Sequence, residues 1–366
     1  MGFLWISGFE RPTVRRMASG VRSGEDLGPH LQSITAWLSP RLPGVSGLPL
    51  VTQYSGGASN WTYRLEYTGH DLVLRRPPAG TKAKSAHDMG REFRVQSALK
   101  PAFPYVPKMI GLCEDEAVLG STFYVMERIA GIIPRANLPR SVRLTPTQTR
   151  TLCENLVERL IELHRVDVNA TGLVSLGKGP GYAKRQIEGW SERFDRAKTW
   201  NVPGFQRVKA WLRANTPDDV AGCLIHNDYR FDNVVLDEAD PTRVVGVLDW
   251  EMATVGDPLM DLGGSLAYWV QADDDLFAQK TRRQPTQLPG MMSRQELVAY
   301  YRERMPFKAP PDFTFYEVYG MFRLAGILQQ IYYRYHHGQT RNPSFKHFWL
   351  IVHYFDRRCR RLIRNR

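Results

Sequence analysis

Residues 224–236 read LIHNDYRFDNVVL, and residues 244–250 read VVGVLDW. In both stretches, runs of Val, Leu and Ile of strand length border polar residues, so we expect short buried strands that hold polar loops. The loops carry His226, Asp228 and Asn233, and Asp249 ends the last apolar run. Asp and Asn also form ordinary turns, but their joint spacing favours a site that presents carboxylates.

The spacing of these side chains indicates phosphoryl transfer. Asp228 follows His226 by two residues, and Asn233 follows Asp228 by five. Kinase catalytic loops use this spacing, with the Asp orienting the attacking hydroxyl and the Asn binding magnesium. Asp249 offers a second hard oxygen ligand of the kind that Mg²⁺ prefers, and no His and Cys cluster indicates zinc. We therefore predict Asp228 as the catalytic base and Asn233 and Asp249 as magnesium ligands.

These motifs resemble the aminoglycoside phosphotransferase and choline kinase superfamily, small-molecule kinases related in fold to protein kinases. The resemblance covers most of the chain and rests on residues 226–233, 248–250 and 256–263 (GDPLMDLG). Within this superfamily, the chain resembles the kinase domains that are fused to acyl-CoA dehydrogenases in larger proteins. Residues 73–78, 91–93, 124–127 and 322–330 carry this resemblance. The resemblance implies an α+β, two-lobed, protein-kinase-like fold. Its small lobe would hold an antiparallel sheet, and its larger lobe would be mostly helical.

The chain is expected to divide into three parts. Residues 1–25 would form a flexible arm, residues 26–130 the nucleotide-binding lobe, and residues 131–366 the lobe with the catalytic loop, metal site and acceptor cleft. The apolar patterns and Gly, Pro and Ser signals add detail. They predict an amphipathic helix over 26–42, five strands and one helix over about 45–130, a capped helix after Ser293, a long helix over 316–337, and a polar surface loop over 273–290.

A glycine-containing hairpin is the candidate phosphate cover. Gly56 and Gly57 separate two predicted strands, and glycine lets a backbone approach phosphate oxygens without a Cβ. Ser59 and Asn60 follow and can donate hydrogen bonds. An ordinary hairpin has the same composition, but the position upstream of the catalytic loop favours nucleotide binding.

The next strand carries the candidate phosphate-binding cation. The resemblance implies a lysine at its end, where this chain has Arg75, which keeps the charge but presents a planar fork. Arg76 is an alternative, and so is a solvated arginine on an edge strand. The resemblance pairs the cation with Glu92, on a helix from about 86 to 99, and places an adenine-binding hinge after Met126.

Further residues are expected around the catalytic loop. The resemblance gives His226 and Asp261 supporting roles, with Asp261 bracing the loop through backbone or His226 contacts. Candidate contacts to the acceptor are Arg230, Tyr182, Arg185 and Arg323.

Composition limits the partners. The formal charge of +12 and pI near 9.6 imply attraction to polyanions such as a nucleotide triphosphate, coenzyme A, anionic lipid or nucleic acid. Basic residues are scattered and no nucleic-acid motif is present, so we expect no nucleic-acid partner. The four cysteines are far apart, which favours a reducing, cytoplasmic setting. No apolar run approaches the roughly 20 residues needed to cross a bilayer, so no membrane insertion is expected.

The predicted activity is transfer of the γ-phosphoryl group of ATP or GTP, with Mg²⁺, to a hydroxyl of a small molecule. An anionic acceptor such as a hydroxyacyl-CoA suits the positive charge, and an aminoglycoside is the other acceptor class. The alternative is a nucleotide-binding scaffold without turnover, suggested by Arg75 in place of lysine. The oligomeric state is left open.

Overall fold

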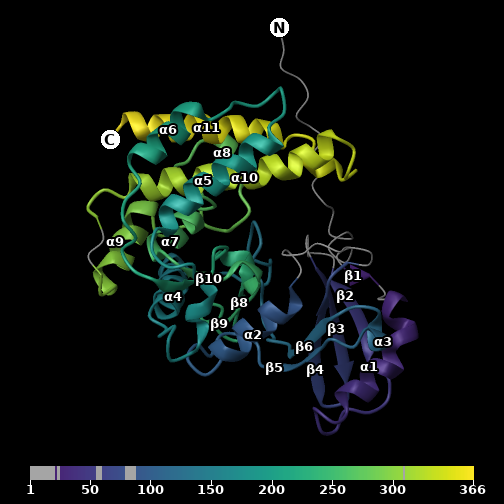
Figure 1. Cartoon of the computed structure of the whole chain (residues 1–366). Helices are drawn as coiled ribbons and strands as arrows, with labels where there is room; N and C mark the ends of the chain where they lie inside the picture. The colour runs from purple at the N-terminus through teal and green to yellow at the C-terminus, as the bar shows by residue number, and fades with distance from the viewer. Residues whose placement is uncertain (1–20, 23–24, 55–59, 79–87, 308–309) are drawn as a thin grey trace. The chain divides into compact units, whose positions relative to one another are not determined.

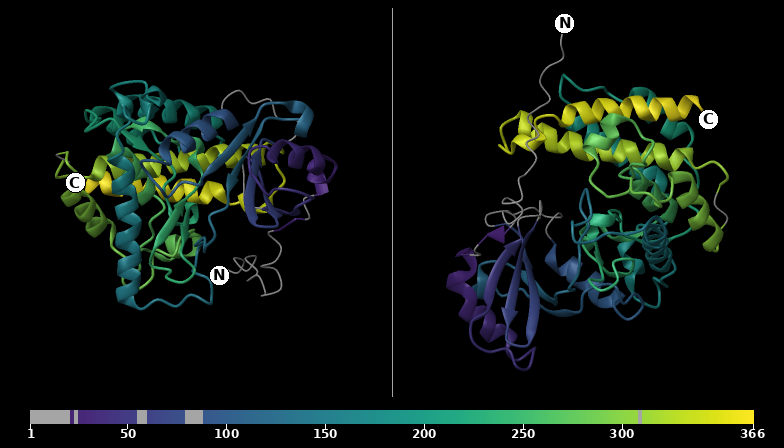
Figure 2. Two further views of the ribbon diagram at one scale, coloured as in Figure 1. Left: turned by 90° about the horizontal axis from the view of Figure 1, so that it is seen from below. Right: turned by 180° about the vertical axis from the view of Figure 1, so that it is seen from behind.

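The computed structural model describes residues 21–22, 25–54, 60–78, 88–307 and 310–366. The chain forms two compact units (Figures 1 and 2). Unit 1 comprises Met1–Ser97 and Pro107–Ile129, and unit 2 comprises Ala98–Val106 and Ala130–Arg366. Unit 1 is built on an antiparallel sheet and unit 2 is mostly helical, so the predicted α+β class is confirmed.

The sheet of unit 1 has six strands in the order β1-β2-β3-β4-β6-β5, and every neighbouring pair is antiparallel. Five strands were expected; the sixth, β1, lies within the predicted flexible arm and pairs with Gln53 and Tyr54. The strands are β1 (Val21–Arg22), β2 (Leu50–Tyr54), β3 (Trp61–Tyr67), β4 (His70–Arg76), β5 (Met109–Cys113) and β6 (Phe123–Glu127).

The two faces of this sheet bury different side chains, because successive residues of a strand point to opposite sides. One face carries Tyr63, Leu65 and Leu74 in a core shared with α1 (Leu31–Leu38). The other face carries Val73, Tyr124 and Met126, which pack with Met89 of α2 (Met89–Leu99). The short helix α3 (Glu116–Leu119) lies against α1 (Figure 1). Arg75 and Arg76 therefore lie on opposite faces.

The predicted helix over 26–42 is shorter than expected. A 3-10 helix with Pro29 inside it, Glu25–His30, precedes α1, and α1 ends at Leu38. Proline has no amide hydrogen to donate to an α-helical ladder, so α1 begins only after it.

Unit 2 is organised around its longest helix, α10. This helix packs against α5, α7 and α11, and Figures 1 and 2 show α10 and α11 running side by side. Reciprocal capping boxes start α4, at Thr145 and Gln148, and α9, at Ser293 and Glu296; the second was predicted. The helices are α4 (Pro146–His164), α5 (Tyr182–Ala197), α6 (Gln206–Ala214), α7 (Pro258–Leu266), α8 (Leu276–Thr281), α9 (Arg294–Arg304), α10 (Thr314–His336) and α11 (Phe348–Arg364).

Two short antiparallel pairs hold the predicted catalytic segments. β7 (Cys223–Ile225) pairs with β10 (Thr254–Gly256), and β8 (Val234–Leu236) pairs with β9 (Val244–Val247). β7, β8 and β9 come from the apolar runs of the two stretches that the sequence singles out, whereas β10 follows them and was not predicted. Their ends fix where the polar loops begin.

The predicted surface loop over residues 273–290 is wrong. The segment contains α8, and its Gln284 and Thr286 side chains are only 1% exposed. Both are buried because they hydrogen-bond distant backbone groups: Gln284 accepts from the Phe231 amide, and Thr286 accepts from the Val270 amide. Polar composition alone does not reveal such partners.

Residues 98–106 belong to unit 2, although the sequence placed them in the nucleotide-binding lobe. The Phe103 ring lies 6.0 Å from the Trp250 ring, and the Val247 amide donates to the Tyr105 carbonyl at 2.7 Å. Because residues 103 and 105 contact residues 250 and 247, the segment belongs to unit 2 although it precedes the predicted boundary at residue 130. In the part of the chain that the structure describes, no helix has the length and apolar character to span a membrane.

Candidate active site

The two catalytic loops begin with unusual backbone. Among the described residues, three that are not glycine have positive φ, and two of them are Asn227 (65°) and Asp249 (68°). This left-handed region is unfavourable for most side chains, and Asn and Asp tolerate it best. The turn at Asn227 follows β7 and the turn at Asp249 follows β9. The sequence thus places residues that accept these turns where each loop leaves its strand.

Asp261, on α7, anchors the first loop. Its Oδ2 accepts from the His226 amide and its Oδ1 from the Asn227 amide, both at 2.8 Å. His164 Nε2 lies 3.1 Å from Oδ2, and its Nδ1 lies 2.6 Å from the Tyr301 hydroxyl. Burial would raise the pKa of Asp261, but the His164 hydrogen bond and the His226 contacts hold that pKa below its usual value. An ionised, buried carboxylate therefore fixes the end of β7.

His226 bridges the two loops in a neutral form. The Asp228 amide donates to His226 Nδ1 at 3.2 Å, so Nδ1 carries no proton. His226 Nε2 must then donate to the Leu248 carbonyl, which is 2.9 Å away. The ring is fully buried, 4.8 Å from the Trp250 ring. His226 therefore has a structural part in this site, consistent with the supporting role expected of it.

Asp228 and Asn233 are joined within one loop. Asn233 Nδ2 donates to the Asp228 carbonyl at 2.8 Å and to Asp228 Oδ2 at 2.9 Å. This orients the amide so that Asn233 Oδ1 is the atom available as a ligand. The Asn233 carbonyl accepts from the Leu248 amide at 2.8 Å, which ties this loop to the one bearing Asp249. The Asp228 side chain is 18% exposed, so an acceptor molecule can reach its carboxylate.

The donor set fits magnesium. Mg²⁺ is typically bound by one or two carboxylates together with phosphate oxygens and water. Asn233 and Asp249 offer oxygen ligands from loops joined through Leu248. Within the described ranges, no group of three His, Cys, Asp or Glu side chains forms a complete metal cage.

Two arginines lie beside the catalytic loop. Arg230 Nε is 3.2 Å from Asp228 Oδ2, its NH1 is 3.1 Å from Asp232, and its guanidinium lies 4.9 Å from the Tyr268 ring. Arg323, on α10, is buried and donates to the Asn227 carbonyl at 2.6 Å. None of the ion pairs found among the described residues includes Arg323. Two guanidinium groups thus lie at the loop of the predicted base, and one of them is paired with Asp228 and Asp232.

The other two acceptor candidates differ in position. The Tyr182 hydroxyl donates to Asn227 Oδ1 at 3.0 Å, and its buried ring packs beneath the loop. Arg185, in the first turns of α5, instead donates to the segment before this helix, at the Gly179 carbonyl (2.6 Å) and the Pro180 carbonyl. The structure brings Tyr182, Arg230 and Arg323 to the catalytic loop, and not Arg185.

Unit 1 holds a buried polar cluster centred on Glu92. Arg75 Nε lies 3.5 Å from Glu92 Oε2, the Tyr124 hydroxyl donates to Oε2 at 2.7 Å, and Asn60 Nδ2 donates to Oε1 at 3.3 Å. Arg76 points to the opposite face, where it pairs with Asp26 at 2.9 Å. Strand alternation therefore assigns Arg75, rather than Arg76, to the Glu92 side.

The predicted hinge is partly committed to the sheet. After Met126, the Glu127 amide donates to the Lys108 carbonyl at 2.8 Å, and the Arg128 amide donates to the Asp71 carbonyl at 2.9 Å. An adenine would have to use other backbone groups of this segment. The predicted contacts Gly56, Gly57 and Ser59 lie outside the described residues.

Two residues that hold this site were not found from the sequence. His164 is the last residue of α4 and bonds Asp261. Gln284 bonds the Phe231 amide, and its segment was interpreted as a surface loop. The position of His164 on the apolar stripe of α4 was a signal of burial; Gln284 carried none.

Known proteins with similar sequences support the motif analysis. The family model described as "Phosphotransferase enzyme family" matches residues 50–297. Acyl-CoA dehydrogenase family member 11 of Rattus norvegicus is 36% identical over 315 residues, covering 83% of this chain and 39% of that protein. Family member 10 of Mus musculus is 35% identical over 293 residues, covering 80% and 27%. The chain therefore spans well under half the length of these relatives.

Solved structures give the same result. A Ralstonia eutropha protein, described as a candidate aminoglycoside phosphotransferase, has a TM-score of 0.78 and 28% identity, covering 91% of this chain and 98% of that chain. Choline kinase from Cryptosporidium parvum has a TM-score of 0.61 at 11% identity, covering 91% and 95%, which shows the shared fold alone. The kinase-like fold predicted from the motifs is confirmed. Because the family model covers most of its length, the chain belongs to the phosphotransferase enzyme family.

Proposed function

We propose that this chain is a magnesium-dependent kinase of small molecules, which transfers the γ-phosphoryl group of ATP or GTP to a hydroxyl. The observation that carries the proposal is the joined loop pair: Asn233 holds the Asp228 carboxylate, and Leu248 ties Asn233 to the Asp249 loop. Phosphoryl transfer needs chiefly positioning and charge stabilisation, and this arrangement offers both.

In the proposed reaction, the acceptor oxygen forms a bond to the γ-phosphorus while the bond to the β-phosphate bridging oxygen breaks. Asp228 orients the acceptor hydroxyl and takes its proton. Asn233 Nδ2 donates to Asp228 Oδ2 at 2.9 Å and thereby fixes the orientation of the carboxylate. Magnesium, held by Asn233 Oδ1 and Asp249, would supply charge neutralisation at the phosphates. In unit 1, Arg75 would bind phosphate oxygens, with Glu92 holding its guanidinium.

An anionic hydroxylated acceptor, such as a hydroxyacyl-CoA, is the acceptor class we favour. Arg230 lies next to Asp228, and Arg323 brings a second buried cation to the same loop. The net charge of +12 acts in the same direction. Relatives named for acyl-CoA dehydrogenases are consistent with this class. The other class, aminoglycosides, is polycationic and would meet these arginines unfavourably; phosphate transfer to a hydroxyacyl-CoA but not to kanamycin would distinguish the two.

Nucleotide binding should depend on Asp249. At nucleotide concentrations about 100-fold above Kd, binding adds about 2.7 kcal/mol to the unfolding free energy, and we expect this in the native chain with MgATP. The Asp249→Ala variant, or chelation of magnesium, should remove most of it. Thermal unfolding measures the effect. Asp237→Asn, in the turn between β8 and β9, is the matched control. An equal shift in both variants would contradict the magnesium role, and no shift in the native chain would favour the scaffold without turnover.

Substitution of Arg75 should weaken MgATP binding, whereas substitution of Arg76 should lower thermal stability. Arg75→Gln is expected to raise the Kd for MgATP by about 10- to 100-fold, because a hydrogen bond to a charged group is worth about 1.5–3 kcal/mol. Arg76→Gln should leave that Kd nearly unchanged but lower the melting temperature, since it removes the pair with Asp26 and the stacking on Trp61 at 4.9 Å. Calorimetric titration and thermal unfolding of both variants test this, and the reverse pattern would reassign the phosphate contact.

A further inference from the structure

The turn that carries Asn233 is capped from a distance. The 3-10 helix Phe231–Asn233 begins after Arg230, whose side chain accepts no capping hydrogen bond. The first amide of the turn, that of Phe231, instead donates to Gln284 Oε1 at 2.8 Å, from a residue 53 positions later. Phe231 is fully buried and Gln284 is 1% exposed, so water cannot replace this acceptor. A buried amide left without an acceptor destabilises the fold.

The same side chain also contacts the residue that supports Arg230. Gln284 Nε2 donates to the Tyr268 carbonyl at 3.4 Å, a long and weaker bond. The Tyr268 ring lies 4.9 Å from the Arg230 guanidinium, whose Nε is 3.2 Å from Asp228 Oδ2. One buried amide therefore touches both the turn bearing Asn233 and the support of the arginine beside Asp228.

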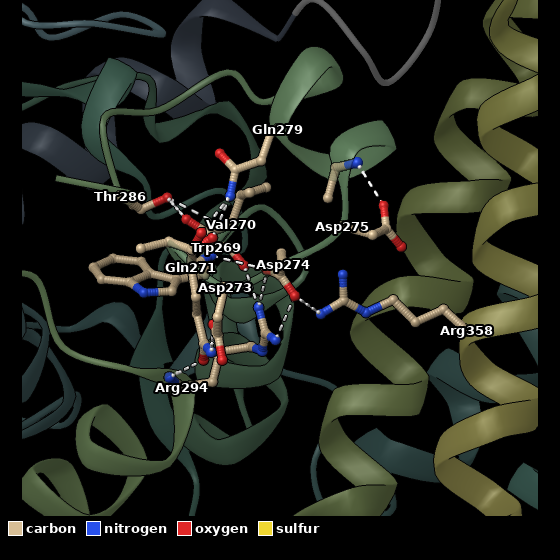
Figure 3. A network of polar contacts seen from close by, with 12 residues as sticks. Trp269, Val270, Gln271, Asp273, Asp274, Asp275, Gln279, Thr286, Arg294 and Arg358 are labelled. Atoms are coloured by element: carbon tan, nitrogen blue, oxygen red, sulfur yellow. Dashed lines mark hydrogen bonds and ion pairs between the residues drawn. The ribbon is translucent and has the colours of Figure 1, made fainter.

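A network of hydrogen bonds fixes Trp269 and Val270, which follow Tyr268 in the chain (Figure 3). The Thr286 hydroxyl accepts from the Val270 amide at 3.1 Å and donates to the Val270 carbonyl at 2.9 Å. Arg294 NH1 donates to the Trp269 carbonyl at 2.8 Å and to Asp274 at 2.7 Å. The Trp269 ring lies 5.9 Å from the Phe231 ring. The segment behind the catalytic turn is thus held on several sides.

We propose that Gln284 is a positioning residue of the catalytic loop. It sets the start of the Phe231–Asn233 turn and the Tyr268 backbone together, and through them the placement of Asn233 and Arg230 around Asp228. This inference rests on the proposed function for its kinetic consequence. Its structural half, that Gln284 holds the Phe231 amide, stands without it.

The test compares two glutamines of one segment. Gln284→Leu removes both hydrogen bonds at nearly constant volume. Gln279→Leu is the control, because Gln279 Nε2 donates to the Gln271 and Ala272 carbonyls (2.5 and 3.3 Å; Figure 3 shows Gln279 and Gln271) and none of its hydrogen bonds reaches the catalytic loop. Amide hydrogen exchange of residues 226–236 should lose protection at Phe231 in Gln284→Leu and not in Gln279→Leu. Unchanged protection in Gln284→Leu would overturn the inference, whether or not any phosphotransfer is found.

The kinetic arm uses magnesium-dependent turnover of ATP by the full chain. Gln284→Leu should lower kcat by about 10- to 100-fold, as loss of an outer contact to a metal site does. The KM of Gln284→Leu for ATP should stay close to that of the native chain. General unfolding would instead lower the fraction of active protein, and the melting curve of the variant would show it. A higher KM for ATP with an unchanged kcat would contradict the positioning role of Gln284. If the native chain shows no turnover, the proposed function fails, and the exchange experiment still decides the role of Gln284.

A second variant guards against a folding artefact. The protonated carboxyl of Gln284→Glu keeps one acceptor for the Phe231 amide and one donor for the Tyr268 carbonyl, whereas the ionised form places negative charge against that carbonyl. Burial raises the pKa of an introduced carboxyl. The kcat of this variant relative to the native chain should therefore rise as the pH is lowered. If the kcat of Gln284→Glu relative to the native chain equals the relative kcat of Gln284→Leu at every pH, the two hydrogen bonds have no role in positioning.

Discussion

Replacing Asp228 with asparagine is expected to lower kcat by about 10²- to 10⁴-fold, the range that a positioned general base contributes. The amide cannot take the proton of the acceptor hydroxyl. In the native chain, Asp228 Oδ2 accepts from Asn233 Nδ2 and Arg230 Nε. An NH₂ group at that position would meet two donors instead. Binding of MgATP should persist, because the predicted magnesium ligands are unchanged. Initial rates with an acceptor identified by screening, together with a nucleotide titration, measure both effects.

The control for this experiment is Asp237→Asn. Asp237 caps the turn between β8 and β9 by accepting from the Ala239 and Asp240 amides, so it tests loss of a nearby carboxylate without loss of the base. Its kcat should match that of the native chain. A kcat for Asp228→Asn that also matches would remove Asp228 from the proposed mechanism.

The second large effect is expected on stability, from Asp261→Asn. The buried carboxylate accepts from the buried His226 amide and from the half-buried Asn227 amide, and it contacts buried His164. A hydrogen bond to a charged group contributes about 1.5–3 kcal/mol, and Asp261→Asn weakens or removes several such bonds at once. The asparagine also turns an NH₂ group toward one of these donors. Chemical denaturation followed by tryptophan fluorescence should show this loss, whereas Asp167→Asn, in an exposed turn, should lose far less.

The effect of Asp261 should depend on pH in a defined direction. The pKa of Asp261 is lowered in the folded chain from a reference of 3.8. The ionised carboxylate therefore stabilises the fold above pH 3.8, and this contribution is lost as the pH falls through the lowered pKa. Asp261→Asn cannot ionise, so its deficit relative to the native chain should narrow as the pH falls below 3.8. A deficit that stays constant down to the acid transition would contradict an ionised Asp261.

Local sequence patterns were sufficient where a residue acts with its neighbours. The spacing of His226, Asp228 and Asn233 lies within one loop, and the structure joins Asp228 to Asn233 directly. The apolar runs correctly indicated β7, β8 and β9, but not β10, which pairs with β7. The kinase-like fold followed from these same motifs.

Residues whose partners are distant in sequence could not be found in this way. Gln284 acts on Phe231 across 53 positions, and His164 acts on Asp261 across 97. The choice between Arg75 and Arg76 depended on which face of β4 meets α2, which strand register decides. In each case the partner is brought close only by packing of the whole unit, so composition and spacing carry no trace of it.

The interruption of unit 1 by residues 98–106 also constrains how the chain matures during synthesis. Phe103 and Tyr105 leave the ribosome long before Trp250 and Val247, the residues that later contact them. At a translation rate of about 5–20 residues per second, the wait from Tyr105 to Val247 is roughly 7–28 seconds. Throughout this interval the nascent chain carries an aromatic segment whose partners do not yet exist. A fragment ending at Ile129 would lack Val247 and Trp250, so we expect its aromatic segment to stay without these partners and to promote aggregation.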